Sequence, residues 1–178
     1  MEYELMARSA IDVQFDDKDI YRLVNTLLKR IDNPQPLLKT VGRFIRKQTT
    51  KMFRGRRPDT GGVRGEKWPK LAESTIMQKA ALKKRGKAIE IHRPLVRTGA
   101  LRTSLAASSA LKIMRKGLEY GTDVKSKKGF SYPGFHQVGD SRVPARRWLF
   151  LNKEELNQIA HSTKQFLEGK LVELTGKG

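Results

Sequence analysis

The clearest pattern in the chain is a run of apolar residues that recur every three or four positions near the N-terminus. This spacing predicts an amphipathic helix with one apolar side, made of Ile20, Leu23, Val24, Leu27, Leu28 and Ile31. Asp16 and Asp17 precede the run, as expected for a helix N-cap with acids in the first turn. The helix should end at Asn33, because a proline follows.

A second run with helical spacing follows at once and predicts another helix. Its apolar side carries Leu37, Leu38, Val41, Phe44, Ile45, Gln48 and Met52. The opposite side is basic, with Arg43, Arg46, Lys47 and Lys51. A solvated surface is one interpretation of this basic side, and phosphate binding is the other.

The remaining segments mix the two-residue period of strands with the helical period. Residues 9–15 alternate like a half-buried strand, and residues 111–120 alternate on both sides of a turn at Arg115-Lys116-Gly117, which predicts a hairpin. Residues 71–82 and 156–171 have helical spacing, residues 132–139 form an aromatic turn region, and residues 143–151 resemble a strand or a strand entering a helix. Because the periods do not alternate regularly, we expect an α+β fold, with a small mixed antiparallel sheet packed by amphipathic helices.

The length of 178 residues indicates a single domain. Its expected parts are listed by residue: an N-terminal strand or arm at 1–15, two helices at 16–53, a long flexible basic loop at 54–67, a core with the hairpin at 68–151, and a C-terminal helix at 152–172.

The charge of the chain is large and uneven. Its formal net charge is +19, yet residues 1–19 hold six acids against two bases, a net charge of −4. Residues 39–70 hold eleven bases against two acids, a net charge of +9. Such a field attracts polyanions, either nucleic acid or acidic protein surfaces.

The usual chemistry of enzymes is missing from the sequence. The chain contains no cysteine, its three histidines are far apart, and its central acids are isolated. Without a nucleophile motif or clustered carboxylates, we expect no catalytic residues, no metal and no cofactor. The N-terminal residues lack the basic start and apolar core of a signal peptide, and no run reaches the length of a membrane span, so we expect no membrane partner.

Four motifs in order carry a resemblance to a known family. They are Trp68-Pro69-Lys70-Leu71 with Ser74-Thr75, Leu95-Val96-Arg97-Thr98-Gly99-Ala100-Leu101-Arg102-Thr103-Ser104, Phe135-His136-Gln137-Val138-Gly139, and Val143-Pro144-Ala145-Arg146-Arg147-Trp148-Leu149. Together they resemble the phage virion morphogenesis family, also called the tail completion family of tailed bacteriophages. Tyr132-Pro133-Gly134-Phe135 before His136 and Trp148 after Arg147 depart from the family pattern.

The resemblance implies a structural role late in virion assembly, at the junction of tail and head. Related neck and tail-end proteins form rings, commonly of six copies. The expected partners are other copies of the chain, tail terminator or tail tube proteins and head-connector proteins, with packaged DNA as a further option in the channel. No catalytic residue and no small-molecule substrate come with the family. The expected location is the virion, and the host cytoplasm during assembly.

The motif residues can be given physical roles under this interpretation. Trp68 is either an anchor for the flexible loop or an ordinary core tryptophan, and these roles are compatible. His136 and Gln137 are expected to fix their turn through backbone hydrogen bonds, with a subunit contact as the alternative. One of Arg146 and Arg147 should pair with an acid of a neighbouring subunit, or else make a weak surface ion pair. Gly99 should permit a tight turn.

The candidate contact residues fall into two groups. Contacts to subunits or neighbouring rings are expected at Asp16, Asp17, Asp19, Arg54, Arg56, Arg57, Arg64, Trp68, His136, Gln137, Arg146, Arg147 and Trp148. Contacts to DNA or to an acidic ring are expected at Lys125, Lys127 and Lys128. Since a closed ring needs two different complementary faces, the acidic start of the chain and the basic residues 39–70 form one candidate pair. The alternative function is that of a basic nucleic-acid-binding protein.

Overall fold

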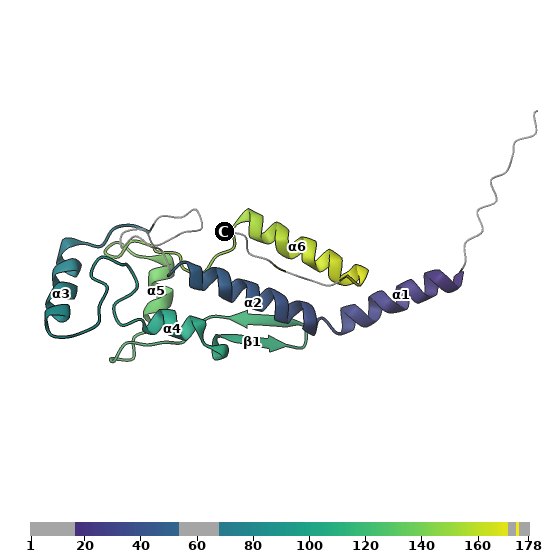
Figure 1. Cartoon of the computed structure of the whole chain (residues 1–178), viewed down its shortest axis with the longest axis horizontal. Helices are drawn as coiled ribbons and strands as arrows, with labels where there is room; N and C mark the ends of the chain where they lie inside the picture. The colour runs from purple at the N-terminus through teal and green to yellow at the C-terminus, as the bar shows by residue number, and fades with distance from the viewer. Residues whose placement is uncertain (1–16, 54–67, 171–173, 175–178) are drawn as a thin grey trace, which may run out of the picture.

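The computed structural model describes residues 17–53, 68–170 and 174. Six α-helices and a two-stranded antiparallel sheet are found there, which confirms a mixed α+β fold. The elements are α1 (Asp17–Asp32), α2 (Gln35–Lys51), α3 (Glu73–Lys84), α4 (Ala100–Ala106), a single 3₁₀ turn (Ser108–Ala110), β1 (Leu111–Met114), β2 (Gly117–Tyr120), α5 (Tyr132–Val138) and α6 (Lys153–Glu168). The molecule is elongated, with α1 at one end and α3 at the other (Figure 1).

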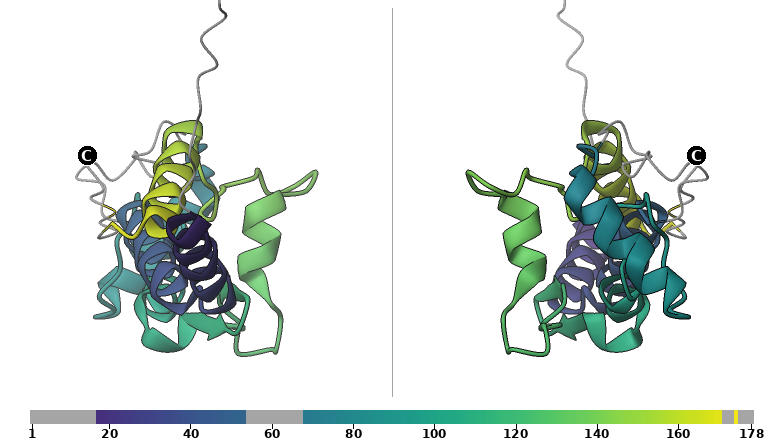
Figure 2. Two further views of the ribbon diagram at one scale, coloured as in Figure 1. Left: turned by 90° about the vertical axis from the view of Figure 1, so that its right-hand side faces the viewer. Right: turned by 90° about the vertical axis from the view of Figure 1, so that its left-hand side faces the viewer.

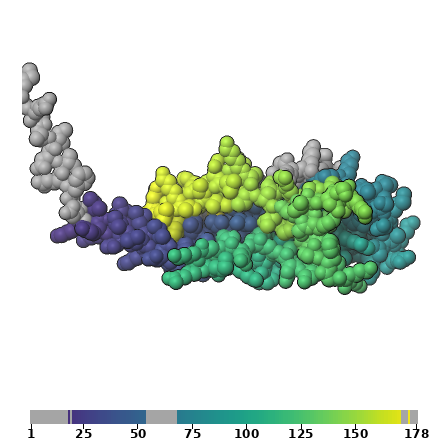
Figure 3. Space-filling model, turned by 180° about the vertical axis from the view of Figure 1, so that it is seen from behind, coloured from purple at the N-terminus to yellow at the C-terminus, as the bar shows by residue number. Residues whose placement is uncertain are grey.

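Helix α2 is the central element of the fold. It lies between α6 on one side and the hairpin on the other (Figures 1 and 3), and it contacts both strands, α4 and α6. Pro36 is in its first turn, where the missing N–H costs no hydrogen bond. The hairpin approaches α2 closely at Gly42, because a Cβ there would lie 2.7 Å from the side chain of Leu111. A two-stranded hairpin is marginal alone, so this packing stabilises it.

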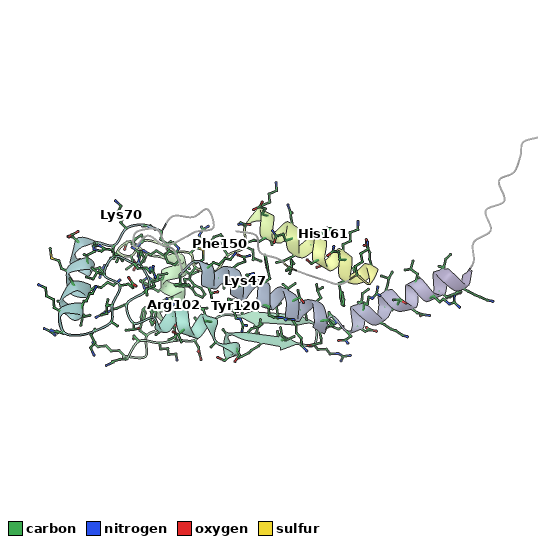
Figure 4. The ribbon with its side chains drawn as sticks, viewed as in Figure 1. Lys47, Lys70, Arg102, Tyr120, Phe150 and His161 are labelled. Atoms are coloured by element: carbon green, nitrogen blue, oxygen red, sulfur yellow. The ribbon has the colours of Figure 1, made fainter. Side chains whose placement is uncertain are left out.

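The hairpin forms in the expected place. Leu111 pairs with Tyr120 and Ile113 pairs with Leu118 in antiparallel register. The Tyr120 hydroxyl donates to the Leu105 carbonyl at 2.9 Å, and burial raises the pKa of Tyr120 to about 12. Figure 4 shows Tyr120 on the hairpin side of α2 and His161 on α6 at the opposite side.

Two predictions of local structure are wrong. Residues 132–138 form the short helix α5 instead of an aromatic turn. When the molecule is viewed along its long axis, α5 stands to one side of the body (Figure 2). Residues 143–151 are not a strand: in the described part of the chain the sheet has only β1 and β2. The backbone of this segment bonds to α5 instead of to a neighbouring strand, as shown below.

Helices α3 and α6 form close to the predicted segments 71–82 and 156–171, with shifts at their ends. Helix α6 ends at Glu168 rather than Leu171, because Gly169 follows in the left-handed region with φ of 84°. In α3, Lys79 is the buried residue and donates its Nζ to the Arg93 carbonyl at 2.7 Å, whereas Met77 is exposed. The strand predicted at 9–15 and the loop predicted at 54–67 lie outside the described residues.

Candidate assembly surfaces around a motif core

Gln137 on α5 fixes the segment after the helix. Its Oε1 accepts from the backbone N–H groups of Trp148 and Leu149 at 3.0 and 3.1 Å, and its Nε2 donates to the Leu149 carbonyl at 2.6 Å. One amide side chain therefore satisfies three backbone groups that a neighbouring strand would otherwise satisfy. Gln137 thus makes backbone hydrogen bonds as expected, but it makes them to residues 148 and 149 and not within a turn of its own segment, and the alternative of a subunit contact stays a prediction.

His136 contributes its backbone to the same arrangement. Its carbonyl accepts from the Arg146 N–H at 2.7 Å. The ring packs edge-on to Tyr132, and the buried Nδ1 has no hydrogen-bond partner among the described residues. Burial lowers the pKa of His136, and the nearby charge of Arg146 lowers it further.

The Arg146 side chain joins this segment to the residues around Trp68. Its guanidinium is buried and donates to the carbonyls of Pro69 at 3.1 Å and Lys70 at 3.0 Å. A planar fork suits two adjacent acceptors, and burial lowers the pKa of Arg146. Because this side chain is used inside its own chain, the predicted ion pair with a neighbouring subunit stays a prediction for Arg147, which is exposed.

The two tryptophans join these segments through hydrogen bonds of their indole N–H groups. Trp68 donates its Nε1 to the Arg147 carbonyl at 2.8 Å and packs edge-on against Phe53. Trp148 donates its Nε1 to the Pro133 carbonyl at 2.9 Å. Both rings are buried, and both indole N–H groups are satisfied, as buried tryptophans require. Trp68 is thus a core tryptophan that also fixes the chain where the basic stretch 54–67 ends.

Two glycines make the turns that this packing needs. Gly99 adopts φ of 77° immediately before α4, which carries Leu101 and Leu105 into the core. Gly139 adopts φ of 76° after α5, and a Cβ there would lie 2.4 Å from the Ala145 nitrogen. All four sequence motifs therefore meet in one place. We call their meeting point the motif core, consisting of Trp68, Leu101, Leu105, Gln137, Arg146 and Trp148.

The motif core is arranged for packing. Its polar side chains bind backbone groups of the same chain, and its remaining members are apolar or aromatic. In the part of the chain that the structure describes, no group of three or more His, Cys, Asp or Glu residues could hold a metal ion. Within the same residues, no helix is long and apolar enough to cross a membrane.

The surface of the described chain is strongly basic. Helix α2 carries five cations and no acid, and its Lys39, Arg43 and Lys47 are exposed. Figure 4 shows Lys47 on α2 and Lys70 near α3. Within the predicted contact set, the exposed cations of the described residues are Lys125, Lys127, Lys128 and Arg147. Asp17 and Asp19 belong to the first turn of α1, whereas Asp16, Arg54, Arg56, Arg57 and Arg64 lie outside the described residues.

A second surface was not identified from the sequence. The apolar side of α1 is exposed: Ile20, Leu23, Val24, Leu28 and Ile31 keep between 45% and 61% of their surface accessible. With the half-buried Leu27 these residues form a surface that we call the α1 stripe. Its helical spacing was visible in the sequence, but the same pattern is typical of helices that pack on their own core.

These features define a small α+β protein with a tightly bonded core and two unusual surfaces, one basic and one apolar. Among curated proteins, the chain is similar to the Mu-like prophage FluMu G protein 1 of Haemophilus influenzae. The two are 28% identical over 165 residues, which is 93% of this chain and 97% of that protein. The similarity links the chain to bacteriophage proteins. No family model matches the chain, and no solved structure matches it.

Proposed function

We propose that this chain is a structural protein of a tailed-bacteriophage virion that acts in tail completion and in joining the head to the tail. The observation that carries the proposal is the similarity to a Mu-like prophage protein over nearly the full length of both chains. The four motifs that resemble the tail completion family support it, because in the structure they meet in one core.

The proposal includes assembly into a ring around the DNA channel, with six copies as the favoured number. A ring needs a heterologous interface, in which one face of a subunit meets a different face of the next. We take the exposed α1 stripe and the basic side of α2 as these two faces, because one is apolar and uncovered and the other carries five cations. A function without catalysis is consistent with the motif core, whose polar groups are bonded within the chain.

The experiment is to remove the gene from the phage or prophage that encodes the chain and to examine the lysate by electron microscopy. We expect filled heads and separate tails that fail to join, with a loss of infectious particles of at least a hundredfold. Supplying the intact gene from a plasmid should restore joined particles. Normal particles and titre without the gene would contradict the proposal.

A second candidate is binding to nucleic acid, favoured by the exposed cations of α2 and of residues 125–128. Binding that relies on phosphates weakens steeply as salt rises. A titration of duplex DNA at several salt concentrations distinguishes the two functions. Tight, sequence-tolerant binding at physiological salt would favour this candidate, whereas loss of binding well below that salt would favour an acidic protein partner.

A further inference from the structure

Helix α1 projects from one end of the molecule. It extends past the body formed by α2, α6 and the hairpin (Figures 1 and 3). Its main contact is with the end of α6, where the Arg30 guanidinium donates to the Leu167 carbonyl and lies where a Cβ on Gly169 would be. A cation at the C-terminus of a helix is favourable, so this contact fixes the base of α1 while its apolar side stays uncovered.

The exposed surface is large enough to take part in a stable interface. Five aliphatic side chains that are each about half exposed present an apolar surface on the order of 500 Å². In a standard protein interface each partner buries roughly 800 Å², so the strip would supply a large part of one side. Leu23 and Leu28 are 61% and 52% exposed in the middle of the strip. Water contact over such a strip is unfavourable, so the strip is expected to be covered in the assembled state.

The charges around the strip indicate what covers it. The stripe begins beside the acidic start of the chain, where residues 1–19 have a net charge of −4, while the chain as a whole has a net charge of +19. The N-terminal stretch that ends in the first turn of α1, with Asp17 and Asp19, is therefore opposite in charge to the rest of the protein and to α2, which has five cations and no acid. A polyanion such as DNA does not suit an apolar strip that starts at two aspartates.

The start of α1 and the basic side of α2 lie far apart within one copy (Figure 1). Helix α1 has 16 residues and is about 24 Å long at 1.5 Å per residue. Asp17 and Asp19 are at the end of α1 that is distant from α2. The basic side of α2 is thus out of reach of this end of α1 within one copy.

From these observations we infer that the α1 stripe docks on a second copy of this chain. The acidic first turn of α1 in one copy lies against the exposed Lys39, Arg43 and Lys47 of α2 in the next. This inference rests on the proposed ring, and it names the two faces that form the contact. Because the faces differ, each copy can both give and receive an α1 helix, which is the condition for a closed ring.

The first test measures association by sedimentation velocity over a range of concentrations. The wild-type chain should associate, and Leu23→Gln/Leu28→Gln should raise the apparent dissociation constant at least tenfold. The pair Leu23→Ala/Leu28→Ala should do the same while keeping helix propensity, as circular dichroism would check. Lys29→Gln, at an exposed position on the opposite side of α1, is the matched control and should associate like the wild type.

The second test exchanges the charges. Asp17→Lys/Asp19→Lys and Lys39→Glu/Arg43→Glu/Lys47→Glu should each associate poorly alone, and an equal mixture of the two variants should associate again. A mixture that stays as weak as either variant would overturn the contact between α1 and α2. A wild-type chain that stays monomeric at every concentration, alone and with the other tail-end proteins, would overturn the docking altogether.

The outcomes separate this inference from the proposed function. Mass spectrometry of purified virions reports whether the chain is a virion protein, whatever its behaviour alone. A chain that is present in virions but whose stripe variants assemble and join tails normally would refute the docking and leave the proposed function standing. A chain that associates through the stripe but is absent from virions would refute the proposed function instead.

Discussion

The motif core and helix α1 use similar side chains in opposite ways. In the motif core, Trp148 and Leu105 are at most 5% exposed, and the polar Gln137 and Arg146 bond to backbone groups. In α1, Leu23 and Ile31 are 61% and 58% exposed, although the helix has the most regular apolar pattern in the chain. The difference separates residues that make the fold from apolar residues that stay exposed on a single copy. Substitutions in the first region should change folding stability, and substitutions in the second should change association.

The largest effect on stability is expected at Trp148. Trp148→Ala removes a buried indole and its hydrogen bond to Pro133, and it should lower the free energy of unfolding by about 3–5 kcal/mol. Denaturant unfolding followed by circular dichroism measures the loss. Trp148→Phe keeps most of the buried ring but not the N–H group, so it should lose less. A loss below about 1 kcal/mol for the alanine variant would contradict the role given to the motif core.

A smaller loss is expected at Gln137. Gln137→Ala leaves two N–H groups and one carbonyl without their partner, which should cost about 2–4 kcal/mol by the same measurement. Gln78→Ala, at an exposed position of α3, is the control and should change stability by less than about 0.5 kcal/mol. Equal stabilities of the two variants would show that segment 143–151 does not depend on this side chain.

The pH dependence of stability should report on His136. Burial holds the pKa of His136 below its ordinary value of 6.5, so the unfolded chain takes up this proton at a higher pH than the folded chain does. Stability should therefore fall as pH falls from about 6.5 through the lower pKa of the folded state. His136→Gln should flatten the profile in this window. A wild-type profile that stays flat there would contradict this assignment.

The smallest effect on stability is expected in α1. Leu23→Gln/Leu28→Gln should lower the free energy of unfolding of the monomer by less than about 1 kcal/mol, because both side chains are already more than half exposed. The measurement is made at a concentration where the chain is monomeric. A loss as large as that of Trp148→Ala would mean that the stripe packs within its own copy.

The sequence was sufficient for elements with a strong local pattern. The helices α1, α2 and α6 and the hairpin were predicted from periodicity and from turn residues such as Pro34. The motif residues were also recognised. Their mutual contacts were not predictable, because Gln137 and Arg146 act on backbone groups 11 to 77 positions away in the chain. The same long-range bonds replace a partner strand for residues 143–151, which is why that strand was predicted wrongly.

The exposure of α1 could not be predicted for a related reason. An apolar helical side has the same pattern whether it packs on its own core or on another copy. What distinguishes the cases is the position of α1 beyond α2, which depends on the contact between Arg30 and the end of α6. The acidic start of the chain, opposite in charge to the whole, was the one signal in the sequence, and the proposed contact with α2 makes use of it.

The most direct test is the mass of the intact chain in solution, measured by light scattering on a size-exclusion column at moderate and high salt. The account predicts a discrete ring-sized species, or a monomer that becomes one when tail-end or connector proteins are added. The proposed contact combines apolar and charged groups, and salt screens only the charged ones. Raising the salt should therefore weaken the association between copies without abolishing it. A strict monomer that ignores those proteins and binds nucleic acid would contradict the account.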